Sequence, residues 1–143
     1  MRTSPAVAVI SQLQRGDRVS LIPAGTGTLP SSLSSDLQNV AQSAASLAPT
    51  DGKCDITLAL AEAMNVLEAG DSINREIYLI TDRQSVNWSG MDESYAAAMA
   101  RRMASSARPP RIFLIPVGGM ERRNVAVESF VAHGLPAVAK QPV

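Results

Sequence analysis

Apolar residues recur in this chain at two spacings, one typical of amphipathic helices and the other of buried strands. The helical spacing predicts a first helix that begins at Ser4-Pro5, with Ser as N-cap and Pro as first helical residue, and that ends at Gly16. It predicts a second helix whose inner face runs from Leu37 to Leu47 and whose end is marked by Pro49.

Two more helices are predicted in the second half of the chain. Asp55 is placed to cap a third helix, which ends at Gly70, and the segment from Ser89 to Asp92 introduces a fourth. Apolar residues at helical spacing are expected on the inner faces of these two helices: Ile56, Leu60, Met64 and Leu67 on the third, and Tyr95, Met99 and Met103 on the fourth.

Short apolar runs rich in β-branched residues predict strands at Arg18 to Pro23, Ile77 to Ile80 and Ile112 to Val117, the last two of them buried. The imperfect alternation from Asn124 to Val131 predicts an outer strand. Strands that alternate with helices form a mostly parallel sheet with helices on both faces, so we predict a three-layer α/β fold.

The strand around Ile77 to Ile80 stands out because a charged residue follows it directly. Its apolar run is typical of a central parallel strand that is covered on both faces. Asp82 then lies at the carboxyl end of this strand. Ligands of open α/β sheets bind in the crevice beyond the carboxyl ends of the strands, so Asp82 is a candidate site residue.

Composition narrows the classes of function. Thirteen basic and thirteen acidic residues cancel, which gives no electrostatic reason to expect nucleic acid or an anionic membrane as a partner. The single cysteine, Cys54, excludes an internal disulfide and a cysteine-based zinc site. No apolar run reaches the roughly 18 to 20 residues of a membrane span. Gly25 to Thr28 lacks the Lys-Ser/Thr ending of a phosphate loop, and His133 has no neighbour at a triad spacing.

Taken in order over residues 4–131, these segments resemble a von Willebrand factor A domain. The resemblance rests on Asp51 to Ile56 before a helix rich in Ala and Leu, on Glu76 to Asp82, and on Arg111 to Gly118. Thr81-Asp82-Arg83-Gln84 followed by Trp88 is similar to the bacterial aerotolerance-type group. The resemblance implies a domain over 1–131, a linker or the start of another domain over 132–143, and a membrane-anchored parent protein in the bacterial cell envelope.

The resemblance also implies a metal-ion-dependent adhesion site, which this chain matches in one of three parts. Asp82 matches the aspartate after the fourth strand. Cys54 occupies the position expected to carry Thr, and a thiol is a poor ligand for Mg²⁺. An Asp-x-Ser-x-Ser loop would lie before Met1, and Mg²⁺ is implied only if that loop exists.

The chain also opens on a helix, without the strand that would normally lead into it. Either the chain is a fragment whose start lies upstream, or Met1 is a true start and the sheet lacks a central strand. We favour the fragment, because a sheet without that strand has two unpaired edges in its middle. The resemblance places the absent strand between the strand at Arg18 and the strand at Glu76.

Several site residues have two interpretations each. Asp82 is either a metal ligand or an acid that orders the loop after the strand. Arg83 beside it either takes the place of a cation by forming an ion pair with Asp82 or forms no such pair. Trp88 is either a partner contact or a cover for the top of the sheet. Cys54 is either a reactive thiol near a helix start or a small buried residue.

The function that we predict is a protein-interaction module with a degenerate metal site, not an enzyme. Its partner surface is expected to include Cys54, Asp55, Arg83, Gln84 and Trp88, on the loops at the carboxyl end of the sheet. Two alternatives remain. One is a small α/β hydrolase or nucleotide-handling enzyme that uses Asp82, and the other is a metal-free structural spacer.

Overall fold

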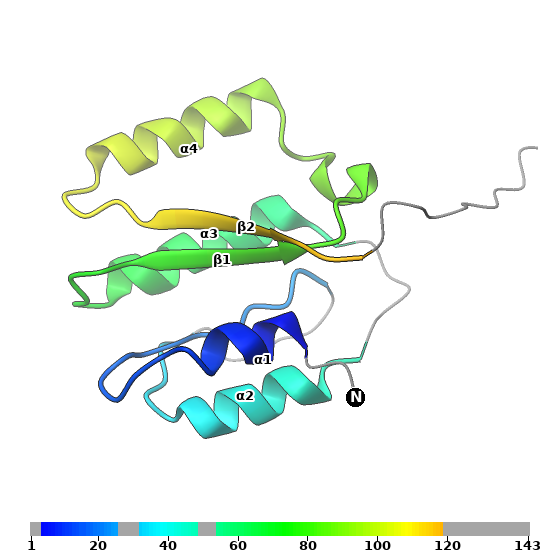
Figure 1. Cartoon of the computed structure of the whole chain (residues 1–143). Helices are drawn as coiled ribbons and strands as arrows, with labels where there is room; N and C mark the ends of the chain where they lie inside the picture. Colours follow the sequence, from blue (N-terminus) through cyan, green and yellow to red (C-terminus); the bar gives the residue numbers. More distant parts are fainter. Residues whose placement is uncertain (1–3, 26–31, 49–53, 119–143) are drawn as a thin grey trace, which may run out of the picture.

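The computed structural model describes residues 4–25, 32–48 and 54–118. These residues form helices and two strands (Figure 1). In chain order the elements are α1 (Pro5–Ile10), α2 (Leu37–Ser46), α3 (Ile56–Ala69), β1 (Glu76–Thr81), the 3-10 helix η1 (Ser85–Trp88), α4 (Glu93–Ser105) and β2 (Arg111–Pro116). The fold is therefore of the mixed α/β class. No helix in the described part of the chain is long and apolar enough to cross a membrane.

The two strands are parallel neighbours that are joined through α4. Their register pairs Glu76 with Arg111 and Thr81 with Pro116. Parallel neighbours need a crossover connection, and α4 supplies it. Among the described residues the sheet contains these two strands only.

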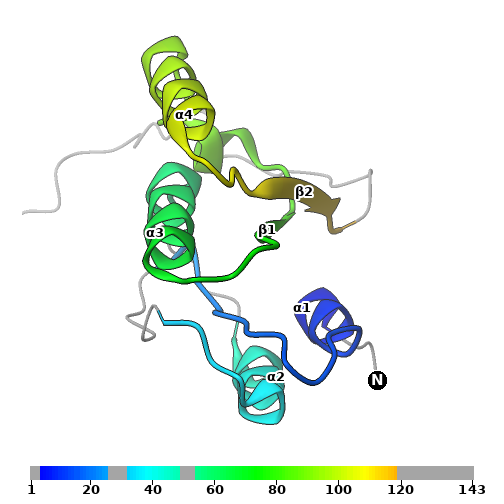
Figure 2. The same ribbon diagram turned by 90° about the vertical axis from the view of Figure 1, so that its left-hand side faces the viewer.

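Helices lie on both sides of β1. In Figure 2, β1 is seen nearly end-on, with α3 on one side of it and α1 on the opposite side. The helix α4 lies on the same side as α3 (Figures 1 and 2), whereas α2 lies next to α1 and farther from the strands. The two pairs of helices thus come from the two halves of the chain.

The largest hydrophobic cluster joins α3 to β1. Its buried members are Ile56, Leu60 and Met64 of α3 and Ile77 of β1, and Met64 is only 1% exposed. Partly buried residues from β1, η1, α4 and the turn between η1 and α4 complete it, among them Leu79, Trp88, Met91, Met99 and Met103. Methionine fills irregular gaps well, which suits a core with few aromatic side chains.

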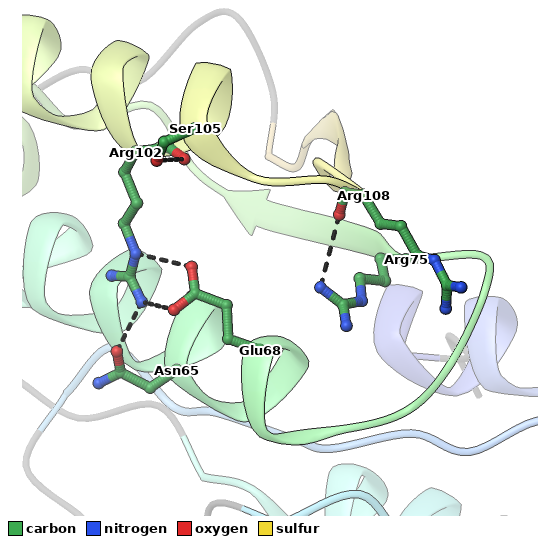
Figure 3. A network of polar contacts seen from close by, with 6 residues as sticks. All are labelled: Asn65, Glu68, Arg75, Arg102, Ser105 and Arg108. Atoms are coloured by element: carbon green, nitrogen blue, oxygen red, sulfur yellow. Dashed lines mark hydrogen bonds and ion pairs between the residues drawn. The ribbon is translucent and has the colours of Figure 1, made fainter.

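Polar contacts fix α4 against α3 at the solvent edge of this cluster (Figure 3). The Arg102 guanidinium donates from Nε to Glu68 Oε1 (2.8 Å) and from Nη2 to Glu68 Oε2 (2.6 Å). Nη2 also donates to Asn65 Oδ1 (2.7 Å). Nearby, Arg75 donates to the carbonyl oxygens of Gly70 (2.9 Å) and Arg108 (3.5 Å), so it links the turns that precede the two strands.

Most of the predicted elements are confirmed. The helices α2, α3 and α4 occupy the predicted stretches, Asp55 caps α3, and Gly70 follows its last residue. Leu47, which was predicted on the inner face of α2, is instead its C-cap and is 45% exposed. The inner face of α4 is confirmed as well, because Tyr95, Met99 and Met103 are its partly buried apolar residues. Strand β1 contains the run from Ile77 to Ile80, with one further residue at each end.

Three further local predictions are wrong. The first helix ends at Ile10 and not at Gly16, and Ser4 makes no side-chain cap bond. Arg18 to Pro23 is not a strand: Val19 alone forms a bridge, antiparallel to Ser34. Strands β1 and β2 were both expected to be buried, but Tyr78 of β1 is 39% exposed and Leu114 of β2 is 52% exposed. The physical reason is that β2 has one strand neighbour among the described residues, so its outer edge and part of each face meet solvent.

Several other predictions lie outside the described residues. They concern the outer strand from Asn124 to Val131, the linker over 132–143, His133, and the loop beyond Gly25.

Candidate functional site at the carboxyl end of β1

Two loops meet at the carboxyl end of β1, where the sequence predicts a site. One follows β1 from Asp82 and contains η1, and the other is the short segment before α3. The backbone N–H of Cys54 donates to Asn87 Oδ1 (3.3 Å) across the two loops. A Cβ atom placed on Gly90 would lie 3.0 Å from Thr57 Oγ1, which shows how closely the first loop approaches the start of α3. The structure therefore brings the predicted segments together.

Asp55 is the N-cap of α3. Its Oδ1 accepts hydrogen bonds from Thr57 N (3.0 Å), Leu58 N (3.3 Å) and Thr57 Oγ1 (2.6 Å). The first backbone N–H groups of a helix have no partner within the helix, and a carboxylate satisfies them. Asp55 also affects Tyr95 of α4: burial first, and then the negative charge of Asp55, raise the pKa of the Tyr95 phenol. Tyr95 donates its hydroxyl to the carbonyl oxygen of Thr57 (3.0 Å).

Asp82 orders the turn that follows β1. Its Oδ1 accepts from Gln84 N (3.2 Å), and its Oδ2 accepts from Gln84 Nε2 (2.7 Å). Between them, Arg83 has a φ of 61°, in the left-handed region, and its N–H donates to Thr81 Oγ1 (3.1 Å). A carboxylate that bonds its own backbone two residues on is typical of turn chemistry. These contacts favour the loop-ordering interpretation of Asp82, while ion pairing with Arg83 stays a prediction.

Trp88 closes the loop against the core. It ends η1, is half-buried, and packs on the cluster formed by α3 and β1. This packing favours the interpretation of Trp88 as a cover over the end of the sheet. The backbone N–H of Met91 donates to the carbonyl oxygen of Trp88 (2.9 Å), which fixes the exit of the loop.

The sequence reasoning missed Val86. It lies on η1 and is 50% exposed, beside the exposed residues Arg83 and Gln84. An apolar residue inside a polar loop is the signal that could have identified it. Cys54, by contrast, is half-buried and precedes the N-cap of α3 by one residue.

Asp55 and Asp82 are the carboxylates that this site offers to a metal ion. Mg²⁺ is bound through one or two carboxylates with near-octahedral oxygen geometry. Within the described ranges there is no group of three or more His, Cys, Asp or Glu side chains that could hold a metal. The carboxylates of Asp55 and Asp82 accept hydrogen bonds from their own loops, and Cys54 offers a soft thiol.

Comparison with known proteins found no match for this chain. No protein-family model matches the chain, and neither a curated protein nor a solved structure matches it.

Proposed function

We propose that the chain is a protein-interaction module, not an enzyme, and that its binding surface is the turn after β1 with the start of α3. In this proposal the domain has the three-layer architecture of a von Willebrand factor A domain, and Asp82 is the remnant of a metal site. Arg83, Gln84 and Val86 form the exposed part of the surface, with Cys54 and Asp55 at its base.

The observation that supports this proposal most strongly is that hydrogen bonds and packing tie the turn to its surroundings while its tip is exposed. Gln84 bonds both carboxylate oxygens of Asp82, Asn87 bonds the segment before α3, and Trp88 packs on the core. A loop that is ordered before binding loses less entropy when a partner docks. An exposed Arg beside an exposed apolar side chain also has the composition of interface residues.

The same contacts weigh against the enzymatic alternative. A hydrolase needs a nucleophile with a base in hydrogen-bond reach, and a nucleotide-handling enzyme needs a phosphate loop. Asp82 is instead used by the turn through Gln84. The metal-free spacer remains the second candidate, since it needs the same fold without a partner at this turn.

Site-specific crosslinking tests the proposal. A photo-activated amino acid at Val86 is expected to capture one protein partner in the source cells, and the same group at Ala100 serves as the control. Ala100 is also exposed but lies on α4, outside both loops of the site. The purified partner must then bind the wild-type chain, with at least tenfold weaker binding for Val86→Asp and unchanged binding for Ala100→Asp.

The spacer and the enzyme predict other outcomes. Equal crosslinking from Val86 and Ala100, or a partner that binds Val86→Asp as tightly as the wild type, would refute the binding surface. Calorimetry with Mg²⁺ and Mn²⁺ tests the degenerate site separately. Millimolar or tighter affinity that is lost in Asp82→Ala would show that a metal site has been retained.

A further inference from the structure

Methionine side chains make the hydrophobic contact between α4 and the rest of the fold. The residues of α4 that pack on the cluster of α3 and β1 are Met99 and Met103. Met91, in the turn between η1 and α4, packs on the same cluster. This packing therefore depends on one side-chain chemistry, and we call Met91, Met99 and Met103 the methionine contact.

The methionine contact is partly open to solvent. Its three members are half-buried, and no residue of α4 is buried. In contrast, Met64 of α3 is only 1% exposed. The helix α4 lies farther from β1 than α3 does (Figure 2). A small oxidant dissolved in water is therefore expected to reach Met91, Met99 and Met103 before it reaches Met64.

Oxidation of a methionine changes the polarity of its side chain. The sulfur lone pair attacks one oxygen of a hydroperoxide, the O–O bond breaks, and the products are the sulfoxide and water or an alcohol. The sulfur loses two electrons and the peroxide gains them, so no other reactant is needed. A sulfoxide is polar, and burying a polar group without a hydrogen-bond partner is unfavourable. The buried residues of the cluster are apolar, so an oxidised methionine contact favours solvent over the cluster.

Polar contacts also hold α4, on either side of Met99 in the sequence. The Tyr95 hydroxyl donates to the Thr57 carbonyl oxygen (3.0 Å). The Arg102 guanidinium donates to both carboxylate oxygens of Glu68 (2.6 and 2.8 Å; Figure 3). The bonds from Arg102 are exposed, and exposed ion pairs contribute little to stability. Hydrophobic packing contributes in proportion to the apolar area removed from water, so the attachment of α4 depends mainly on the methionine contact.

We infer that the methionine contact is a redox-sensitive attachment: a hydroperoxide oxidises it to sulfoxides, and α4 then separates from α3. The turn before α4 is released with the helix, because Met91 belongs to both the turn and the contact. Trp88 directly precedes this turn, and its carbonyl oxygen accepts from Met91 N (2.9 Å). Methionine sulfoxide reductases restore the thioether and thereby the attachment. This device does not depend on the proposed function.

Hydrogen peroxide added to the full chain tests this inference. Peptide mass spectrometry is expected to show that sulfoxide forms at Met91, Met99 and Met103 at least tenfold faster than at Met64. The backbone amides of α4 are then expected to exchange hydrogen at least tenfold faster than in the untreated chain, because exchange reports local opening. The amides of α2, which contains no methionine, must exchange at an unchanged rate.

Leucine variants provide the matched controls. Leucine is apolar and close to methionine in volume, so it keeps the packing but cannot form a sulfoxide. In the variant that combines Met91→Leu, Met99→Leu and Met103→Leu, peroxide must leave the exchange of α4 unchanged. Met64→Leu keeps the methionine contact, so its response to peroxide must match that of the wild type. In the oxidised wild type, reductases specific for the two sulfoxide epimers must restore slow exchange, which tests the inference without any substitution.

Three outcomes would overturn the inference. Oxidation of Met64 as fast as that of Met99 and Met103 would show that α4 does not shield the cluster. Unchanged exchange of α4 after complete oxidation of the methionine contact would show that the polar contacts suffice to hold this helix. Faster exchange of α4 in the peroxide-treated leucine variant would assign the effect to Cys54 or to a methionine outside the contact.

Discussion

Asp55 and Asp36 both cap helices, and comparing them tests how much the additional hydrogen bonds of Asp55 stabilise the fold. Asp55 Oδ1 accepts three hydrogen bonds, two from the backbone and one from the Thr57 hydroxyl, whereas Asp36 accepts one, from Asn39 N (3.0 Å). Loss of an N-cap costs about 1 kcal/mol. Loss of the Thr57 contact costs about 1 kcal/mol more, because Thr57 is only 8% exposed.

We therefore expect Asp55→Ala to lower the free energy of unfolding by about 2 kcal/mol and Asp36→Ala by about 1 kcal/mol. For a chain of this length, 2 kcal/mol corresponds to a fall in Tm of about 8 °C. Asp55→Asn is expected to stay within about 0.5 kcal/mol of the wild type, since Asn caps helices as well as Asp.

The assay is urea unfolding followed by Trp88 fluorescence and by circular dichroism at the helix band. A double-mutant cycle with Thr57→Val isolates the hydroxyl contact, and its coupling energy is expected to be about 1 kcal/mol. A coupling below about 0.3 kcal/mol would refute the magnitude assigned to the Thr57 contact. An Asp55→Asn variant as unstable as Asp55→Ala would show that the charge of Asp55, and not its capping, is what the fold uses.

Four further predictions concern other parts of the structure. Arg102→Lys keeps the charge but loses the paired bonds to Glu68, so it should lower stability by about 0.5 to 1 kcal/mol in the same urea assay. Hydrogen bonding from Arg102, and then its charge, lower the pKa of Glu68 below its usual 4.5. The stability that ionised Glu68 contributes is therefore complete above pH 4.5 and is lost as the pH falls through the lowered pKa. Glu68→Gln should make the free energy of unfolding less dependent on pH in this acidic range, as measured in the urea assay. Arg83 has a left-handed backbone conformation, which is costly for a residue with a side chain, so Arg83→Gly should stabilise the chain by about 1 kcal/mol in the urea assay. Leu114→Lys should reduce aggregation in light scattering with little change in Tm, because Leu114 is 52% exposed on the edge strand.

The elements of the second half of the chain could be predicted because their local signals agree. Asp55 and Gly70 mark both ends of α3, its apolar residues recur at helical spacing, and the Ile77 run is too short for a helix. Asp82 could also be placed at the end of β1, since a charged residue follows that strand directly.

The first half was harder to predict because its structure depends on neighbours. Arg18 to Pro23 has a strand-like composition, but a strand requires pairing along its length and only Val19 pairs, with Ser34. In the second half of the chain, the predicted burial of β2 was wrong for the same reason, because the burial of a strand depends on which elements cover it and not on its own residues. The bonds between Asp82 and Gln84 were beyond sequence reasoning, because they depend on the left-handed backbone at Arg83.

The position of the main hydrophobic cluster has a consequence for the order of folding. All of its members lie between Ile56 and Met103, within one continuous stretch of the chain. Contacts inside this stretch close shorter loops than contacts between the two halves of the chain, so the unit from α3 to β2 is expected to form first. The helices α1 and α2 contact each other and contribute Ile10 and Ala44 as their buried apolar residues, so they would dock afterwards as a second cooperative unit. On the ribosome this order runs against the direction of synthesis, since the part that emerges first is the part that folds last.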